Sequence, residues 1–143
     1  MDARDDIDPL WAPQPDALPG WFREALAVPR EEGFIDVAGT RIHYFRWGDR
    51  SHPPILMTHG FLAHARCFAF IAPFLAGDHH VIAYDLSGMG DSANRPGCDS
   101  HARGAEMVGV AEALGLFDGP AKPVIIAHSF GASVGLTAMA LAA

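Results

Sequence analysis

The stretch Val124–Gly131, which reads VIIAHSFG, decides the fold of this 143-residue chain. Its first four residues are apolar, which predicts a buried strand, and the apolar residues that continue to Ala143 predict a buried helix. An abrupt strand-to-helix turn strains the residue at its tip, here Ser129, so the residues two positions away must be small. Ala127 and Gly131 are small. The pattern predicts an exposed nucleophilic serine, and the alternative is a serine that only caps the helix.

Two similar apolar runs lie earlier in the chain, at Ile55–Met57 and Val81–Tyr84. We expect all three runs to be strands that are covered on both faces. Helical stretches separate them: Ala65–Leu75, in which Pro73 starts a second short turn, and His101–Leu114, whose apolar residues fall on one face. This alternation of strands and helices predicts a parallel α/β sheet with right-handed crossovers.

The residues before these runs predict an antiparallel hairpin. Phe34–Val37 and Thr40–Trp47 are rich in strand-forming residues and flank the tight turn Ala38-Gly39. Apolar and polar residues alternate along the second of these strands, so we expect one of its faces to meet solvent. The fold class is therefore α/β, with a mostly parallel sheet and an antiparallel N-terminal hairpin.

The chain divides into two parts of unequal length. Residues 1–32 form a proline-rich arm, with a short helix expected at Gly20–Val28, and residues 33–143 form the α/β domain. The first residues are acidic and no apolar run follows them, so we expect no secretory signal and a cytoplasmic protein.

The turns after all three apolar runs are expected to meet at one rim, because the functional crevice of an open α/β sheet lies outside the carboxyl ends of its strands. Acyl transfer through a serine needs two backbone N–H groups aimed at the oxygen that becomes negative. Phe130, the residue after Ser129, is one expected donor, and Phe61 is the other. Gly60 lets that backbone approach closely, and His59 is expected to bond within its own loop and not to act as the base.

The turn after the second run, Asp85–Ser92, has glycines at Gly88 and Gly90 and raises the alternative of a dinucleotide-binding loop. That fingerprint needs a third glycine, where this chain has Ala93, and a helix that opens at the loop. The residues Asn94–Gly97 would break such a helix. We expect a packed turn at the rim of the site instead.

Composition argues against two kinds of partner. The chain has 10 basic and 17 acidic residues without a basic patch, so nucleic-acid binding is not expected. The segment Val124–Ala143 is uncharged apart from a possible charge on His128, and its length raises the alternative of a membrane span. The polar residues within it favour a strand followed by a helix, so no membrane partner is expected.

No metal site is expected, since the eight histidines and two cysteines show no H-E-x-x-H or C-x-x-C spacing. Cys67 lies in an apolar stretch and is expected to be a buried thiol. His79 and His80 precede a predicted strand and are expected at the surface. His128 adjoins the serine, but neighbouring side chains at the end of a strand diverge, so it is not expected to reach the hydroxyl.

Three motifs, in this order and at this spacing, resemble those of the α/β-hydrolase superfamily: His59-Gly60-Phe61, Tyr84–Ser92 and Ala127–Gly131. The resemblance runs from about Gly33 to the last residue. It implies Ser129 as the nucleophile and the Phe61 and Phe130 amides as oxyanion donors, with no cofactor and a small ester-like or related acyl substrate. A serine at this position is typical of the family's esterases, lipases and peptidases, whereas its dehalogenases and epoxide hydrolases use an aspartate.

The chain departs from the superfamily in one respect. There the acid and the histidine of the catalytic triad follow the serine along the chain, but residues 130–143 contain no Asp, Glu or His. We therefore expect the N-terminal half of an α/β-hydrolase domain, a truncated or partial gene product with little activity of its own, whose terminal helix lacks a cover. The alternative function is a non-catalytic binding or interaction module built on the same half-fold.

Overall fold

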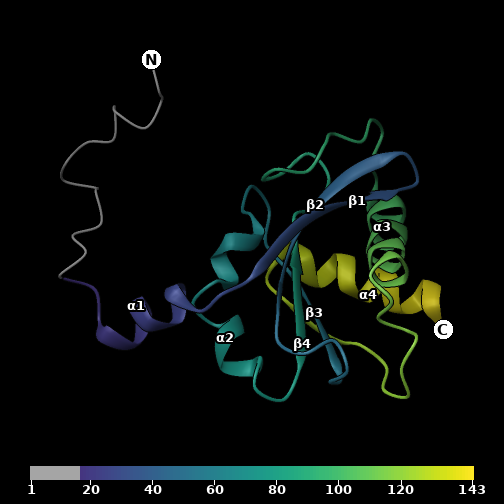
Figure 1. Ribbon diagram of the computed structural model, residues 1–143. Helices are drawn as coiled ribbons and strands as arrows, with labels where there is room; N and C mark the ends of the chain where they lie inside the picture. Colours follow the sequence, from purple (N-terminus) through teal and green to yellow (C-terminus); the bar gives the residue numbers. More distant parts are fainter. Residues whose placement is uncertain (1–16) are drawn as a thin grey trace.

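The computed structural model describes residues 17–143, which form one sheet with helices on both faces (Figure 1). The strands are β1 (Glu31–Val37), β2 (Thr40–Trp47), β3 (Pro54–Thr58), β4 (His80–Tyr84) and β5 (Val124–Ala127). The helices are α1 (Gly20–Ala27), the 3-10 helix η2 (Ala65–Phe68), α2 (Ala72–Leu75), α3 (Ser100–Ala113) and α4 (Phe130–Ala142).

The five strands lie in the order β1-β2-β4-β3-β5. The pairings of β4 with β3 and of β3 with β5 are parallel, whereas those of β1 with β2 and of β2 with β4 are antiparallel. The predicted α/β class is confirmed, with a parallel C-terminal part and an antiparallel hairpin that joins it through β2. At the carboxyl ends of β3 and β5, Thr58 lies opposite Ala127. The turns that follow these two strands therefore start side by side.

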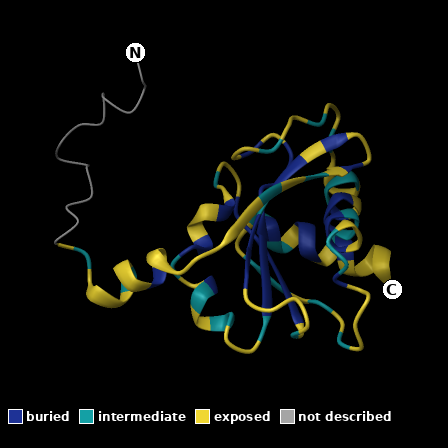
Figure 2. Cartoon of the chain, in the orientation of Figure 1, coloured by how far each residue is buried: buried dark blue, intermediate teal, exposed yellow. Residues whose placement is uncertain are grey.

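Helices α3 and α4 cover one face of the sheet, and η2 and α2 cover the other (Figure 1). Successive residues of a strand point to opposite faces. Ile82 of β4 therefore packs in the core beneath α3 and α4, whereas Val81 packs beneath η2 and α2. Every residue of β3 and β4 is buried (Figure 2), as their apolar runs predicted.

The hairpin has the expected turn, since Ala38 and Gly39 both have positive φ, at 49° and 78°. The expectation that one face of β2 meets solvent is wrong, however. His43 and Arg46 are buried, with 0% and 6% of their surfaces exposed. The reason is that β2 is an inner strand, and Asp85 in the turn after β4 packs against His43.

The end strand β5 is less covered than the sequence predicted. Within residues 17–143 it pairs only with β3, and its Val124 is 56% exposed, so a strand covered on both faces is the wrong expectation here. Beside it, within residues 17–143, α4 exposes the apolar side chains of Leu136 and Met139. α4 has 13 residues, and no helix in the described part of the chain is long and apolar enough to cross a membrane.

The first strand begins earlier than the predicted Phe34–Val37. β1 begins at Glu31, so the hairpin starts inside the predicted arm. α1 agrees with the predicted helix to within one residue at its end. Its Phe22 ring lies 5.1 Å from the ring of Phe70, centroid to centroid, so aromatic contacts hold this helix against the segment between η2 and α2. The rest of the arm, residues 1–16, lies outside the described residues.

Two expectations about single residues are wrong. His80, expected at the surface, is buried as the first residue of β4, where it lies opposite Pro54 in an inner part of the sheet. Cys67, expected to be buried, is exposed, because η2 turns Ala65 and Phe68 toward the core and leaves the cysteine outside.

Candidate active site

Ser129 lies at the turn between β5 and α4. Its backbone angles are φ 52° and ψ −117°, and a positive φ of this kind costs a non-glycine residue about 1–3 kcal/mol. The residue is exposed, and its side chain makes no capping hydrogen bond to α4. These observations disfavour a helix-capping role and agree with the strained turn that the sequence predicted.

The neighbours of this turn have little room for larger side chains. A Cβ atom on Gly131 would lie 2.5 Å from the carbonyl oxygen of His59 and 2.8 Å from that of Thr58. The His128 amide donates to the same Thr58 carbonyl over 3.1 Å. Ala127, on the other side of the serine, is the strand partner of Thr58. The turn is therefore packed directly onto the backbone at the end of β3.

The two amides expected to bind an oxyanion belong to residues that meet in space. The rings of Phe61 and Phe130 pack edge to face with their centroids 5.6 Å apart. A Cβ atom on Gly60 would lie 2.8 Å from His128 Nδ1 and 3.5 Å from Ser129 Cβ, so glycine allows this close approach. In residues 17–143, neither the Phe61 amide nor the Phe130 amide donates to a protein acceptor. Neither N–H group is therefore engaged by the described part of the chain.

The loop after β3 contains a second strained residue. The Ala63 amide donates to the Gly60 carbonyl over 3.2 Å, which closes a four-residue turn. Within this turn Leu62 has a φ of 56° and is 81% exposed. Strained residues cluster at ligand-binding sites, and this apolar side chain lies one residue beyond Phe61.

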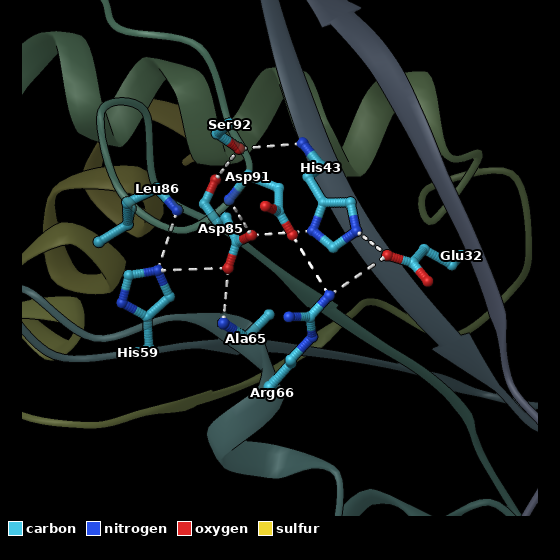
Figure 3. A network of polar contacts seen from close by, with 9 residues as sticks. All are labelled: Glu32, His43, His59, Ala65, Arg66, Asp85, Leu86, Asp91 and Ser92. Atoms are coloured by element: carbon cyan, nitrogen blue, oxygen red, sulfur yellow. Dashed lines mark hydrogen bonds and ion pairs between the residues drawn. The ribbon is translucent and has the colours of Figure 1, made fainter. Parts of the chain in front are cut away.

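Asp85, the first residue after β4, organises the rim of the site (Figure 3). Its buried carboxylate accepts hydrogen bonds from the amides of Ala65, at 2.6 Å, and Asp91, at 2.9 Å. His43 Nδ1 lies 2.8 Å from the same carboxylate. A Cβ atom on Gly90 would overlap the Asp85 carboxylate, so glycine is required there. This is the expected packed turn. No helix opens at its glycines, and the next helix along the chain, α3, begins only at Ser100.

His43 links Asp85 to a surface cluster. Its Nε2 lies 2.8 Å from Glu32 Oε1. Glu32, His43 and Asp91 have possible metal-ligand atoms within 4.8 Å of one another. The Arg66 guanidinium, however, lies 3.8 Å from Glu32 and 3.4 Å from Asp91. Its positive charge therefore already balances these two carboxylates. The lack of a metal site remains a prediction.

A second buried carboxylate, Glu106 of α3, supports the same turn from the other side. It accepts from the Ser87 amide at 2.9 Å and from Arg95 Nε at 3.0 Å. Our sequence reasoning missed Glu106, Asp85 and His43 as organising residues. The place of Asp85 directly after a buried strand was the one signal available, because the partners of all three are distant in sequence.

Within residues 17–143, no carboxylate or imidazole forms a hydrogen bond with the Ser129 hydroxyl. His128 is exposed, and its ring lies against Gly60.

Comparison with known proteins identifies the family: the chain belongs to the Alpha/beta hydrolase family, whose pattern matches residues 55–143. Fluoroacetate dehalogenase from Burkholderia sp. is 35% identical over 72 residues, covering 50% of this chain and 23% of the dehalogenase. Epoxide hydrolase A from Mycobacterium tuberculosis is 31% identical over 114 residues, covering 76% of this chain and 34% of the hydrolase.

Solved structures show the same likeness. The thioesterase domain from the curacin biosynthetic pathway is similar with a TM-score of 0.67 and 30% identity, over 80% of this chain and 41% of that domain. The match covers little more than a third, or less, of the length of the two curated relatives named above. The shared fold and family therefore concern one part of those proteins.

Proposed function

We propose that Ser129 is the nucleophile of an acyl- or ester-type hydrolase, with the amides of Phe61 and Phe130 as oxyanion donors. Two observations support this most: Ser129 is strained, exposed and without a capping bond, and the neighbouring Phe61 and Phe130 amides have no protein acceptor within residues 17–143. The hydroxyl would attack a carbonyl carbon, and the two amides would stabilise the oxygen that becomes negative. The N-terminus of α4 adds its partial positive charge at the same place.

The substrate class follows from the nucleophile. In the family that the chain resembles, dehalogenases and epoxide hydrolases carry an aspartate at the position of Ser129. A serine forms an acyl-enzyme, which favours esters, thioesters or related small acyl compounds. The likeness to a thioesterase domain supports this class.

The base is proposed to lie elsewhere. A serine hydroxyl is a weak nucleophile without a neighbouring base, and residues 130–143 supply no Asp, Glu or His. An acid and a histidine brought next to Ser129 would complete the triad. The chain alone should therefore retain only the catalysis that an oxyanion hole and binding supply, which can reach about 10³–10⁴-fold over water.

The test is labelling with a fluorophosphonate probe, which bonds covalently to reactive serines, together with hydrolysis of p-nitrophenyl acetate. We expect slow labelling at Ser129 that external imidazole accelerates by acting as the base. Ser129→Ala should lose the label, whereas Ser133→Ala, a change at an exposed serine of the same helix, should keep it. Labelling that is absent in the native chain, or that persists in Ser129→Ala, contradicts the nucleophile. Fast labelling without imidazole contradicts the missing base.

A second candidate function is a non-catalytic binding or interaction module. The observation that favours it is the exposed apolar surface of α4, where Leu136 and Met139 are 69% and 59% exposed. Exposed apolar patches of this kind mark interaction surfaces. Such a module would leave Ser129 no more reactive than Ser133 in the labelling experiment.

A further inference from the structure

The ring of His59 is buried and has a defined hydrogen-bond partner at each nitrogen (Figure 3 shows its Nε2 side). The Leu86 amide donates to Nε2 over 3.0 Å, so Nε2 must carry a lone pair. Nδ1 lies 2.8 Å from the Gly60 carbonyl oxygen, which can only accept, so Nδ1 must carry the proton. The geometry thus selects one tautomer of the neutral imidazole.

The surroundings keep this imidazole neutral. Burial lowers the pKa of His59, and this outweighs the opposite effects of its bond to Gly60 and of the Asp85 carboxylate. The nearest Asp85 oxygen lies 4.0 Å from Nε2 and already accepts from the Ala65 amide. A second ring proton would face the Leu86 N–H, which is itself a donor.

The bond at Nδ1 acts on the peptide that carries a proposed oxyanion donor. The Gly60 carbonyl and the Phe61 N–H belong to the same peptide group, and no cis peptide bond occurs in residues 17–143. In a planar trans peptide the C=O and N–H point in opposite directions. His59 Nδ1 and the Ala63 amide together hold the carbonyl, and this fixes the direction of the Phe61 N–H.

We propose that His59 is a positioning residue: its Nδ1–H tautomer, selected by the Leu86 amide, turns the Gly60–Phe61 peptide so that the Phe61 N–H points toward the oxyanion site at Ser129. This inference rests on the proposed function. It assigns the orientation of the donor to a chain of contacts that begins in the turn after β4. His59 acts through the peptide and does not touch the substrate.

The first test reads the tautomer directly in the native chain. Long-range proton–nitrogen correlation spectra of a ¹⁵N-labelled sample distinguish protonated from unprotonated ring nitrogens. At neutral pH we expect a protonated Nδ1 and an unprotonated Nε2 for His59. A protonated Nε2, in the other tautomer or in the imidazolium ion, overturns the proposal.

The second test separates the two bonds of the ring. In His59→Asn the side-chain amide can place an N–H near the position of Nδ1, whereas in His59→Gln it reaches the position of Nε2. The readout is the dissociation constant of phenylboronic acid, which forms a tetrahedral adduct with reactive serines, and the shift of the Phe61 amide proton on binding. We expect His59→Gln to bind about tenfold more weakly, the loss of one hydrogen bond, and His59→Asn to stay near the native value.

Equal effects of the two variants, or native binding by His59→Gln, overturn the positioning role. A poorly dispersed amide spectrum would show that His59→Gln does not fold. In that case the tautomer of the native chain and the binding of phenylboronic acid by His59→Asn test the positioning role, and weak binding by a folded His59→Asn contradicts it. A native chain that forms neither the adduct nor the fluorophosphonate label at Ser129, even with external imidazole, refutes the proposed function and, with it, the purpose of the orientation. A wrong tautomer together with a normal adduct refutes only the inference about His59.

Discussion

Replacing Gly131 by alanine should destabilise the chain although it improves helix propensity. The added Cβ would lie 2.5 Å from the His59 carbonyl oxygen and 2.8 Å from the Thr58 carbonyl oxygen, and these backbone atoms cannot turn aside. Overpacking of this kind costs about 1–3 kcal/mol, and we expect the upper end. The gain in helix propensity offsets about 1 kcal/mol. The free energy of unfolding should therefore fall by about 2 kcal/mol.

Gly135→Ala is the matched control, one turn further along α4. There the nearest neighbour of the added Cβ is a side-chain methyl group, Ile125 Cγ2 at 3.2 Å, which can shift. This variant should be as stable as the native chain or up to about 1 kcal/mol more stable.

Urea denaturation followed by tryptophan fluorescence measures both variants. For a slope of about 1–3 kcal/mol/M, a loss of about 2 kcal/mol lowers the midpoint by roughly 1 M. Gly131→Ala should also slow the labelling of Ser129, because the turn can accept the new methyl group only by moving away from β3. Equal midpoints for Gly131→Ala and Gly135→Ala would refute the reasoning that close backbone packing restricts this position.

Three further predictions concern the supporting structure. Asp85→Asn should lower the free energy of unfolding, measured in urea, by about 3 kcal/mol, because it removes a buried carboxylate that contacts His43 and accepts from two backbone amides. Arg66→Gln is the exposed control and should lower it by less than about 1 kcal/mol. Equal losses in the two variants would contradict this. Burial lowers the pKa of His80 below the ordinary 6.5, so the unfolded chain binds more protons as pH falls below about 6.5 and the free energy of unfolding should decrease there. The decrease should be smaller in His80→Asn, and stability that rises on acidification would oppose it. The exposed Leu136 and Met139 side chains should cause the chain to associate with rising concentration in sedimentation. Leu136→Lys with Met139→Lys should abolish this association and leave stability within about 0.5 kcal/mol, and a native chain that does not associate, or a variant that still does, would contradict the prediction.

The local features of the site were predictable because they depend on short stretches of chain. The strained serine follows from an apolar run and from the small residues Ala127 and Gly131, which lie two positions before and after it. The hairpin turn follows from Ala38-Gly39, because the positive φ angles of both residues favour a small side chain or none. The polar organisers were not predictable in this way. His43 and Asp85 are separated by 42 positions, and no local pattern reports such a contact.

The errors have a common physical origin in burial. A run of residues shows how apolar a strand is, but the neighbours of that strand decide what covers it. β2 contains charged residues, and its position between β1 and β4 nevertheless buries His43 and Arg46. β5 is apolar throughout, and its place at the end of the sheet leaves Val124 exposed.

By itself, the sequence determined the succession of strands and helices along the chain, the turn at Ser129 and the family resemblance, because backbone preferences and side-chain size act over a few residues. Only the tertiary structure decided the order of the strands within the sheet, the burial of His43, and the contact of His59 with both Leu86 and Gly60. The physical reason is that hydrogen bonding and burial depend on which segments meet in space. For Ser129, local residues predicted the strained turn, and the packing of that turn onto β3 placed it beside the Phe61 loop.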